Sequence, residues 1–226
     1  MVTGRSLPHP IPYQGSKRAL AHKILPLFPK EEVRLFEPFA GSAAVSIAAV
    51  ANGKAKSVVL NDANEPLMLL WKRIIEEPGA LLSTYEHLWN AQTGDERRYY
   101  AHVRDEFNKT HDPDRLFYLL ARCVKASVRY NTNGEFNQSP DNRRKGAKPV
   151  TMAKHVNGTS RLLRGITLVR FGDFQKAIAD AEPKDLIYMD PPYQGVGGRR
   201  DNRYFAGLQF AEFVAALEEM NRKGLS

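Results

Sequence analysis

Short apolar runs alternate with helical segments along much of the chain. The runs centre on Leu35, Val59, Leu168 and Ile187. The first run leads through a Gly-containing turn into a helical pattern that ends near residue 51, and the second leads into one over residues 64–75. This strand–helix–strand–helix order predicts an α/β fold with a parallel sheet and right-handed crossovers.

One long stretch interrupts this alternation. Residues 79–128 have helical periodicity with no strand between, and Asp112-Pro113 supplies the N-cap and first-turn proline of a new helix. Just beyond, Asn133-Gly134 between Tyr- and Phe-bearing flanks predicts a hairpin with a two-residue turn. The expected division is a catalytic domain in two parts, 1–78 and 161–226, around an inserted helical and hairpin subdomain at 79–160.

The charge of the chain favours a nucleic-acid partner. The 226 residues carry a formal net charge of +8, with a pI near 9.6. Two basic clusters lie in Gly- and Asn-rich segments, where a flexible backbone can follow phosphates. They are Arg143-Arg144-Lys145 and Arg199-Arg200. The alternative for each cluster is a solvated loop without a ligand.

Composition excludes several other classes of protein. No apolar run is long enough to span a membrane, and the N-terminus lacks the apolar segment of a signal peptide, so we expect a cytoplasmic protein. The single cysteine, Cys123, rules out an internal disulfide and a multi-cysteine zinc site. Its apolar helical context favours core packing, and no metal site is expected.

The most distinctive chemistry lies in Asp190-Pro191-Pro192-Tyr193, after the apolar run 185–189. Two prolines cannot continue a central strand, so the chain leaves the sheet at its carboxyl edge, where α/β proteins bind ligands. There, Asp190 and the Pro191 carbonyl can accept the two hydrogens of an exocyclic amine, and Tyr193 offers a stacking face for a flipped-out base. The pattern therefore favours methylation of an amine such as adenine N6. The alternative is an ordinary Pro-Pro turn with a surface tyrosine.

Other residues are expected at the same edge of the sheet. Asp62 ends the second strand, where it can accept hydrogen bonds from a ribose diol or can cap the next helix. Asp173-Phe174 ends the third strand, where it can bind an adenine ring or merely close a turn. The turn at Gly41 is no GxGxxG fingerprint, but its small residues allow a ligand near the backbone, and Ser42 is the expected N-cap of the following helix.

The N-terminal turn resembles a phosphate-binding loop only superficially. Gly15-Ser16-Lys17 has neither the upstream glycine nor the preceding strand of such a loop, so we reject a nucleotide triphosphatase. A lysine and an aromatic residue, Tyr13, beside a helix N-terminus can hold a carboxylate and cover a ligand. A plain helix-entry turn is the alternative.

Taken in order, these motifs resemble the DNA adenine-N6 methyltransferases of the Dam type, which use S-adenosylmethionine. The resemblance covers Pro12 to about Glu219: an aromatic-x-Gly-x-Lys start, a Phe-x-Pro-Phe-x-Gly turn, an Asp after the second strand, a recognition insert and Asp-Pro-Pro-Tyr. It implies a doubly wound Rossmann-like methyltransferase sheet with an inserted DNA-recognition subdomain. It also implies site-specific methyl transfer to adenine in double-stranded DNA with base flipping, as in restriction–modification or in regulatory or phage methylation. An RNA or protein-amide target is the weaker alternative.

The resemblance further implies roles for individual residues. Cofactor contacts are implied for Tyr13, Lys17, Glu37, Phe39, Gly41, Asp62, Asp173, Phe174 and Asp190. The target base is implied to lie against Asp190, Pro191, Pro192 and Tyr193. DNA contacts are implied for Arg129, Asn131 and Asn137, and are expected for Lys125, Asn133, Arg143, Arg144, Lys145, Arg199 and Arg200. Within the cofactor set, Lys17 is implied near the carboxylate. Val124-Lys125-Ala126 replaces the Tyr-Asn-Gly of GATC-methylating members, so the recognition sequence is not implied.

The end of the chain suggests a further alternative. Residues 209–222 predict an amphipathic helix, with Phe210, Phe213, Val214 and Leu217 on one face. Sheets of the family have strands beyond the one that carries Asp-Pro-Pro-Tyr. We therefore expect, as the alternative, a truncated or split methyltransferase that binds DNA or cofactor with little activity alone. Its unpaired sheet edge would be completed by a second chain or by self-association.

Overall fold

The computed structural model describes residues 7–191 and 210–225. Within these residues, four strands form one parallel sheet in the order β3-β2-β1-β4. The strands are β1 (Val33–Glu37), β2 (Ala55–Leu60), β3 (Thr167–Val169) and β4 (Leu186–Ile187). In the centre, Leu35 lies opposite Val58 on one side and Leu186 on the other. The predicted α/β fold and the four predicted strands are confirmed.

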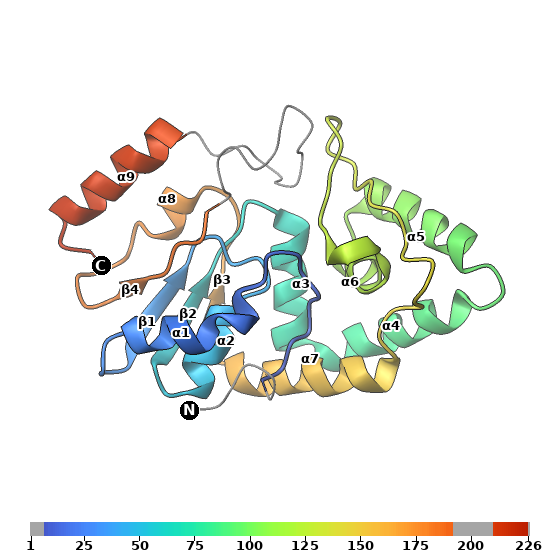
Figure 1. Cartoon of the computed structure of the whole chain (residues 1–226), viewed down its shortest axis with the longest axis horizontal. Helices are drawn as coiled ribbons and strands as arrows, with labels where there is room; N and C mark the ends of the chain where they lie inside the picture. The colour runs from blue at the N-terminus through green and yellow to red at the C-terminus, as the bar shows by residue number, and fades with distance from the viewer. Residues whose placement is uncertain (1–6, 192–209, 226) are drawn as a thin grey trace.

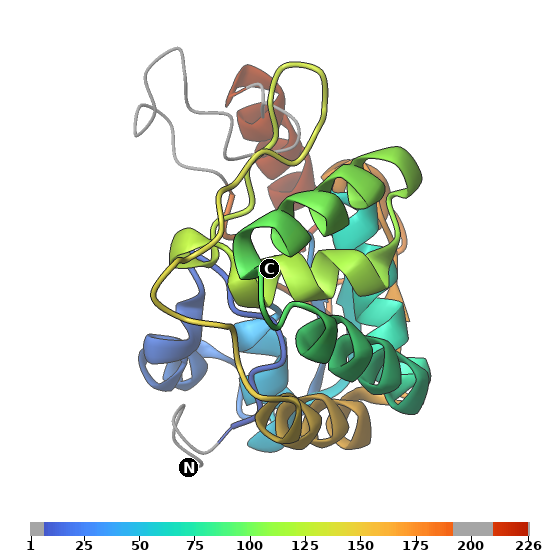
Figure 2. The same ribbon diagram turned by 90° about the vertical axis from the view of Figure 1, so that its right-hand side faces the viewer.

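Helices connect and cover these strands (Figure 1). Those of the sheet part are α1 (Ala21–Ile24), α2 (Ala44–Ala51), α3 (Glu65–Glu76), α8 (Phe174–Ala177) and α9 (Phe210–Arg222), with short 3-10 helices η1 (Lys17–Ala19) and η2 (Leu25–Leu27). Helix α1 lies on the viewer's side of the sheet in Figure 1, at the left in Figure 2. The predicted helix after Asn64 is confirmed, with the Asn64 side chain accepting from the backbone N–H of Leu67.

A second group of helices lies beside α3, at the right of Figure 1. It comprises α4 (Pro78–Ala91), α5 (Glu96–Thr110), α6 (Pro113–Arg122) and the 3-10 helix η3 (Val124–Ala126). This is the helical body expected over residues 79–128. Helix α6 begins as predicted, because the Asp112 carboxylate accepts from the backbone N–H of Asp114 at 2.9 Å.

Helix α7 (Pro149–Leu163) runs beneath both groups and is not among the elements that the sequence predicts (Figure 1). It packs against α2 and α3 of the sheet part and against α4 of the insert. The Ser160 hydroxyl donates to the Ile75 carbonyl at 2.7 Å, which fixes α7 to the end of α3. The expected boundary at residue 160 falls inside this helix.

One apolar core is shared by the sheet and the insert. Trp71 of α3 is fully buried, as are Tyr85 and Tyr100 of the insert. Their hydroxyls are hydrogen-bonded: Tyr85 donates to the Ala147 carbonyl at 2.6 Å and Tyr100 to the Gln138 carbonyl at 3.0 Å. Cys123 is buried in the same core, which confirms its predicted packing role.

Two local expectations are wrong. Ser42 is not the N-cap of α2; that position is Ala43, in a left-handed conformation (φ 47°), and the Ser42 hydroxyl donates to Ser16 Oγ at 2.8 Å instead. The hairpin turn also has three residues rather than two. Asn131 N–H donates to the Glu135 carbonyl, and Gly134 closes the turn at φ 77°. Gly134 N–H also donates to the Asn131 carbonyl at 3.0 Å, so three residues, the last a left-handed glycine, form the turn.

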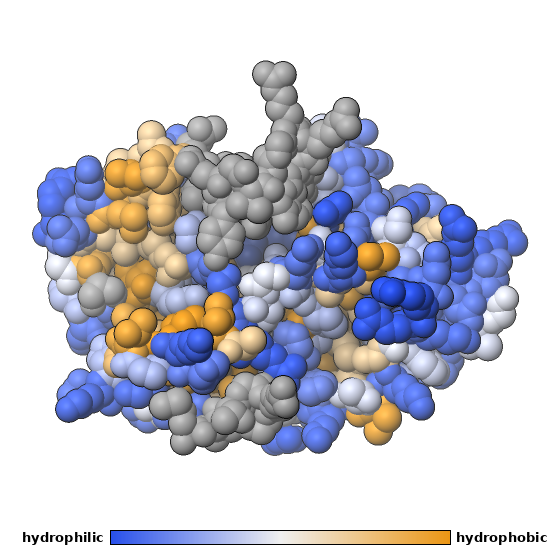
Figure 3. Space-filling model, in the orientation of Figure 1, coloured by the Kyte–Doolittle hydropathy of each residue, from blue (hydrophilic) through white to orange (hydrophobic). Residues whose placement is uncertain are grey.

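The predicted helix near the chain's end is confirmed as α9, but its apolar face is not a buried one. Phe210 and Leu217 are 54% and 40% exposed. Figure 3 shows apolar side chains gathered over this helix, whereas the insert presents a mainly hydrophilic face. Helix α9 contacts the sheet part through Phe213, with its ring 6.2 Å from Phe39 and 5.7 Å from Phe174, and through Met220, which packs against the cluster of Phe36, Val59 and Ile178.

Candidate active site

Acidic side chains from three strands meet at the carboxyl edge of the sheet. Glu37 is the last residue of β1, Asp62 follows β2 and Asp190 follows β4. The N-terminal segment adds one cation: Lys17 Nζ lies 2.5 Å from Asp190 Oδ2. Because the carboxyl ends of neighbouring parallel strands lie side by side, this gathering follows directly from the strand order.

Glu37 is 4% exposed and is held by the start of α2. Its Oε2 accepts from the backbone N–H of Ser46 at 3.1 Å and from the Ser46 hydroxyl. Burial raises the pKa of Glu37 to about 7 against the opposing effect of the Ser46 hydrogen bonds, and the charges of Asp190 and Asp62 raise it further. The carboxyl group therefore changes its charge near neutral pH.

Asp62 joins the turns that follow β1 and β2. Its Oδ2 accepts from the backbone N–H of Gly41 at 3.0 Å, and its Oδ1 accepts from that of Asn64 at 3.0 Å. Burial raises the pKa of Asp62, although these backbone hydrogen bonds oppose the shift. Asn64, not Asp62, caps α3. Asp62 thus holds the turn at Gly41 next to the sheet edge.

The turn at Gly41 is tightly packed on both sides. Gly41 has φ 48°, and a Cβ there would lie 3.2 Å from Tyr13 Cε1. On the other side, Trp71 Nε1 donates to the Gly41 carbonyl at 2.9 Å. Tyr13 and Gly41, both expected at the same site, lie next to each other.

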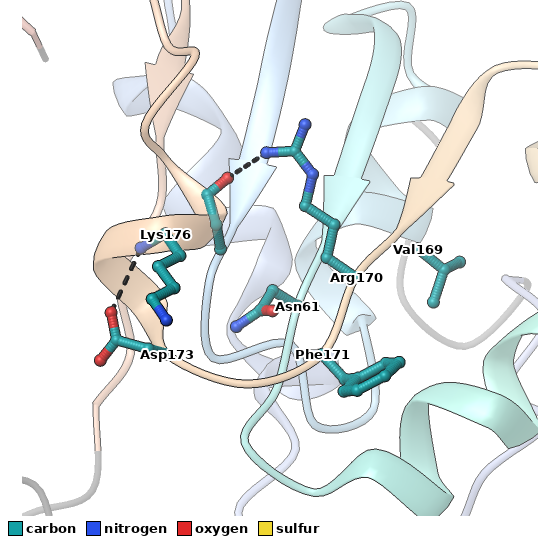
Figure 4. Close-up of a pocket in the computed structure, with 7 residues that line it drawn as sticks. Asn61, Val169, Arg170, Phe171, Asp173 and Lys176 are labelled. Carbon is teal, nitrogen blue, oxygen red and sulfur yellow. Dashed lines mark hydrogen bonds between the residues drawn. The ribbon is translucent and has the colours of Figure 1, made fainter.

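The third strand ends at a pocket of about 280 Å³ beside the same edge (Figure 4). It is lined by Asn61, Val169, Arg170, Phe171, Asp173, Lys176 and Ala177. Asn61 is 1% exposed, and its Nδ2 donates to the carbonyls of Pro38 and Gly172, both at 3.1 Å. Within the described ranges its Oδ1 has no hydrogen-bond partner. Asn61 is therefore a functional candidate that was not predicted from the sequence, although its position directly before Asp62 is a signal for it.

Asp173 and Phe174 have structural contacts of their own. The Asp173 carboxylate caps α8, accepting from the backbone N–H groups of Gln175 at 2.9 Å and Lys176 at 3.2 Å. Phe174 is buried, and its ring centre lies 5.3 Å from that of Phe39. Phe39 and Phe174 therefore form one aromatic surface, with Asp173 at the rim of the neighbouring pocket.

The residues expected to contact DNA lie on the surface of the insert. Lys125, Arg129, Asn133 and Asn137 are exposed, as are Arg143, Arg144 and Lys145. Asn131 has a structural contact in the hairpin, because its Oδ1 accepts from the backbone N–H groups of Asn133 and Glu135, both at 2.9 Å. Pro192, Tyr193, Arg199 and Arg200 lie outside the described residues.

The backbone of the basic loop, residues 141–148, is held in place by hydrogen bonds from a buried arginine. Arg122 is 3% exposed and donates to the carbonyls of Asp141, at 3.1 Å, and Arg144. The Asp141 carboxylate in turn accepts from the backbone N–H of Arg143 and from Arg144 Nε. These contacts leave the side chains of Arg143 and Arg144 84% and 74% exposed on a fixed backbone.

A parallel α/β sheet with carboxylates and a lysine at its carboxyl edge defines a ligand-binding α/β protein. Comparison with known sequences is more specific. Residues 13–222 match the D12 class N6 adenine-specific DNA methyltransferases, and the chain belongs to this family. The resemblance to adenine-N6 DNA methyltransferases that the motifs indicate is thereby confirmed.

Individual relatives are moderately similar. The type II methyltransferase M1.LlaDCHI of Lactococcus lactis subsp. cremoris is 30% identical over 189 residues, covering 80% of this chain and 64% of that protein. The type II methyltransferase M.MjaIII of Methanocaldococcus jannaschii is 29% identical over 201 residues, covering 80% and 68%. The DNA adenine methylase of Escherichia coli K12 is 28% identical over 185 residues, covering 80% and 63%. The chain thus spans about two thirds of the length of these relatives.

Two further observations concern membranes and metals. Among residues 7–191 and 210–225, no helix has the length and apolar character needed to cross a bilayer. In the same part of the chain, His, Cys, Asp and Glu side chains form no group of three that could hold a metal ion.

Proposed function

We propose that this chain transfers a methyl group from S-adenosylmethionine to N6 of an adenine in double-stranded DNA. Membership of the adenine-specific family supports the reaction class. The observation that carries the assignment of the site is the position of Asp190. It lies just beyond β4 at the carboxyl edge, close enough to Glu37 for its charge to raise the pKa of that residue. A cytoplasmic location, where the DNA is accessible, goes with this proposal.

The residues at the edge fit the cofactor by their chemistry. The Asp62 carboxylate accepts from the backbone N–H groups of Gly41 and Asn64, and its remaining acceptor capacity suits a ribose hydroxyl. The pocket next to it offers an unpartnered buried acceptor, Asn61 Oδ1, and the half-exposed ring of Phe171, which suit an adenine amine and its flat face. When bound, S-adenosylmethionine supplies an electrophilic methyl group on its sulfonium.

Asp190 would act on the target amine. The lone pair of an adenine amine is delocalised into the ring, which makes the nitrogen a poor nucleophile. Hydrogen bonds from the amine to the Asp190 carboxylate and to the Pro191 carbonyl draw the nitrogen toward tetrahedral geometry and stabilise the positive charge that develops on it. Tyr193 is proposed to stack on the flipped-out base.

The insert would hold the DNA. Its hairpin and the basic loop present exposed Arg, Lys and Asn side chains, which are the donors that phosphates and base edges require. Because phosphate contacts dominate affinity, changes at Asp190 should affect transfer far more than binding.

Tritiated-methyl transfer onto plasmid DNA, followed by sequencing of the modified positions, tests the proposal. We expect labelled N6-methyladenine with the wild-type chain, and no transfer by Asp190→Ala, which should still bind DNA. Asp105→Ala, at an exposed position of α5, is the matched control and should keep full activity. Near-normal turnover by Asp190→Ala would show that the reaction site lies elsewhere.

A further inference from the structure

Lys17 contacts the residue that the proposed function places on the target amine. Lys17 Nζ lies 2.5 Å from Asp190 Oδ2, and the two side chains are 18% and 24% exposed. Lys17 Nζ also donates to the Gly15 carbonyl at 3.3 Å. The ammonium group is therefore held by its own turn as well as by the carboxylate, and the ion pair is partly shielded from water.

The turn that carries Lys17 is itself fixed to the site. The Ser42 hydroxyl donates to Ser16 Oγ at 2.8 Å, and Ser16 N–H donates to the Tyr13 carbonyl at 3.2 Å. On the side of the insert, Gln14 N–H donates to the Ala126 carbonyl at 2.8 Å. Lys17 thus projects from a backbone tied to the turn after β1 and to the insert, which limits the positions open to its ammonium group.

The partner of Lys17 is the carboxylate on the target-amine side of the site. Glu37, Asp62 and Asp190 all lie at the edge of the sheet, and Lys17 pairs with the carboxylate of the loop after β4. An ammonium group on Oδ2 fixes the rotation of the Asp190 carboxylate, and with it the direction in which this carboxylate can accept a hydrogen from an amine.

We propose that Lys17 is a positioning residue for Asp190, acting in the transfer step through that carboxylate. This inference rests on the proposed methyl transfer and goes beyond it, because it assigns Lys17 to the target-amine side of the site. It predicts that loss of the ammonium group lowers the rate of transfer at saturating cofactor and DNA, while leaving the affinity for cofactor almost unchanged.

The test compares Lys17→Met, Lys17→Gln and Lys17→Arg with the control Lys23→Met, at an exposed position of α1. Calorimetry with S-adenosylhomocysteine gives Kd, and single-turnover methyl transfer at saturating cofactor and DNA gives the rate. We expect Lys17→Met and Lys17→Gln to lose about 100-fold in rate, the scale of a misplaced catalytic group, with Kd within about threefold of the wild type. Lys17→Arg, which keeps a cation, should retain most of the rate.

The opposite pattern overturns the inference. If Kd weakens about tenfold or more while the rate at saturation stays within about threefold, Lys17 binds the cofactor and does not position Asp190. Equal rate losses in Lys17→Met and Lys17→Arg would also contradict a role that depends on charge. A wild-type chain without methyl transfer overturns the proposed function, and this inference with it. An active wild type with fully active Lys17→Met overturns this inference alone.

Discussion

Glu37 couples the ionisation of the candidate site to the stability of the fold. Burial raises its pKa from an ordinary 4.5 to about 7. Between these values the folded chain binds a proton that the unfolded chain does not, so the contribution of Glu37 to the free energy of unfolding falls as the pH rises. At about 1.4 kcal/mol per pH unit, the full loss above pH 7 is about 3 kcal/mol.

Replacing Glu37 with Gln should remove this dependence. We expect the variant to gain about 2.5 kcal/mol relative to the wild type between about pH 5 and pH 8, measured by urea denaturation. The quantity to follow is the difference in the free energy of unfolding between the two chains. Burial lowers the pKa of His9 to about 4, which makes the stability of both chains rise with pH in the acid range and so opposes the effect of Glu37 in the wild-type curve. Glu86→Gln, at an exposed position of α4, controls for the substitution itself. A difference independent of pH would contradict the prediction.

For individual residues, the sequence predicts which acidic side chains lie at the same edge of the sheet, but not which atoms form hydrogen bonds and ion pairs with them. Acids that follow parallel strands must lie at one edge, so the gathering of Glu37, Asp62 and Asp190 can be read from the strand order. Their partners depend on the conformations of the turns. Lys17 pairs with Asp190, and Asp62 accepts from the backbone N–H of Gly41, because loop geometry brings those atoms within reach.

Among the elements, the basic loop offers a direct test of the DNA-binding face. Neutralising Arg143, Arg144 and Lys145 together should weaken binding to all DNA sequences and flatten the salt dependence, by roughly 0.9 in log–log slope for each phosphate that the loop no longer neutralises. All three side chains pair with a carboxylate, Arg143 and Arg144 with Asp141 and Lys145 with Glu96. Lys145 should contribute least, because it has the shortest of these contacts, at 2.5 Å, and its side chain is the least exposed, at 56%. Fluorescence anisotropy with duplex DNA over a range of salt concentrations measures the slope.

The control for this experiment is Lys30→Gln, since Lys30 is exposed and precedes β1 at the opposite edge of the sheet. It should leave the slope unchanged. Equal slopes in the wild type and the triple variant would show that the basic loop faces away from DNA.

The elements differ in how well the sequence predicts them. Strands and helices with strong periodicity were predictable, including the start of α6 at Asp112 and of α3 at Asn64. Helix α7 is missing from the prediction although Pro149 at its first position and the buried pair Met152 and Val156 are typical helix signals. The lengths of turns were harder to predict from the sequence, because Asn-Gly occurs in both two-residue and three-residue hairpins and packing decides between them.

For the whole molecule, the shared core predicts a single unfolding transition. Two tryptophans report on the two parts: Trp71 lies in α3 of the sheet part and Trp89 in α4 of the insert. Because α7 packs against both α3 and α4, neither part can unfold without exposing apolar surface of the other. We expect the fluorescence of Trp71→Phe and Trp89→Phe to report coincident urea transitions, after correction for any change in stability.

Circular dichroism of the wild type, which follows the helices of both parts, provides the reference curve. Two separated midpoints, with Trp89 changing at lower urea, would show that the insert unfolds as an independent domain.

The position of α7 also bears on how DNA specificity could be exchanged between relatives. A chimera that replaces the segment before Pro149 would keep all of α7, together with the contact of Ser160 with the end of α3. A junction at residue 160 would join most of one protein's α7 to the last turn of another's, and the hybrid helix would have to pack against α2, α3 and α4. Recombination between relatives should therefore succeed most often when the crossover falls in the loop just ahead of this helix.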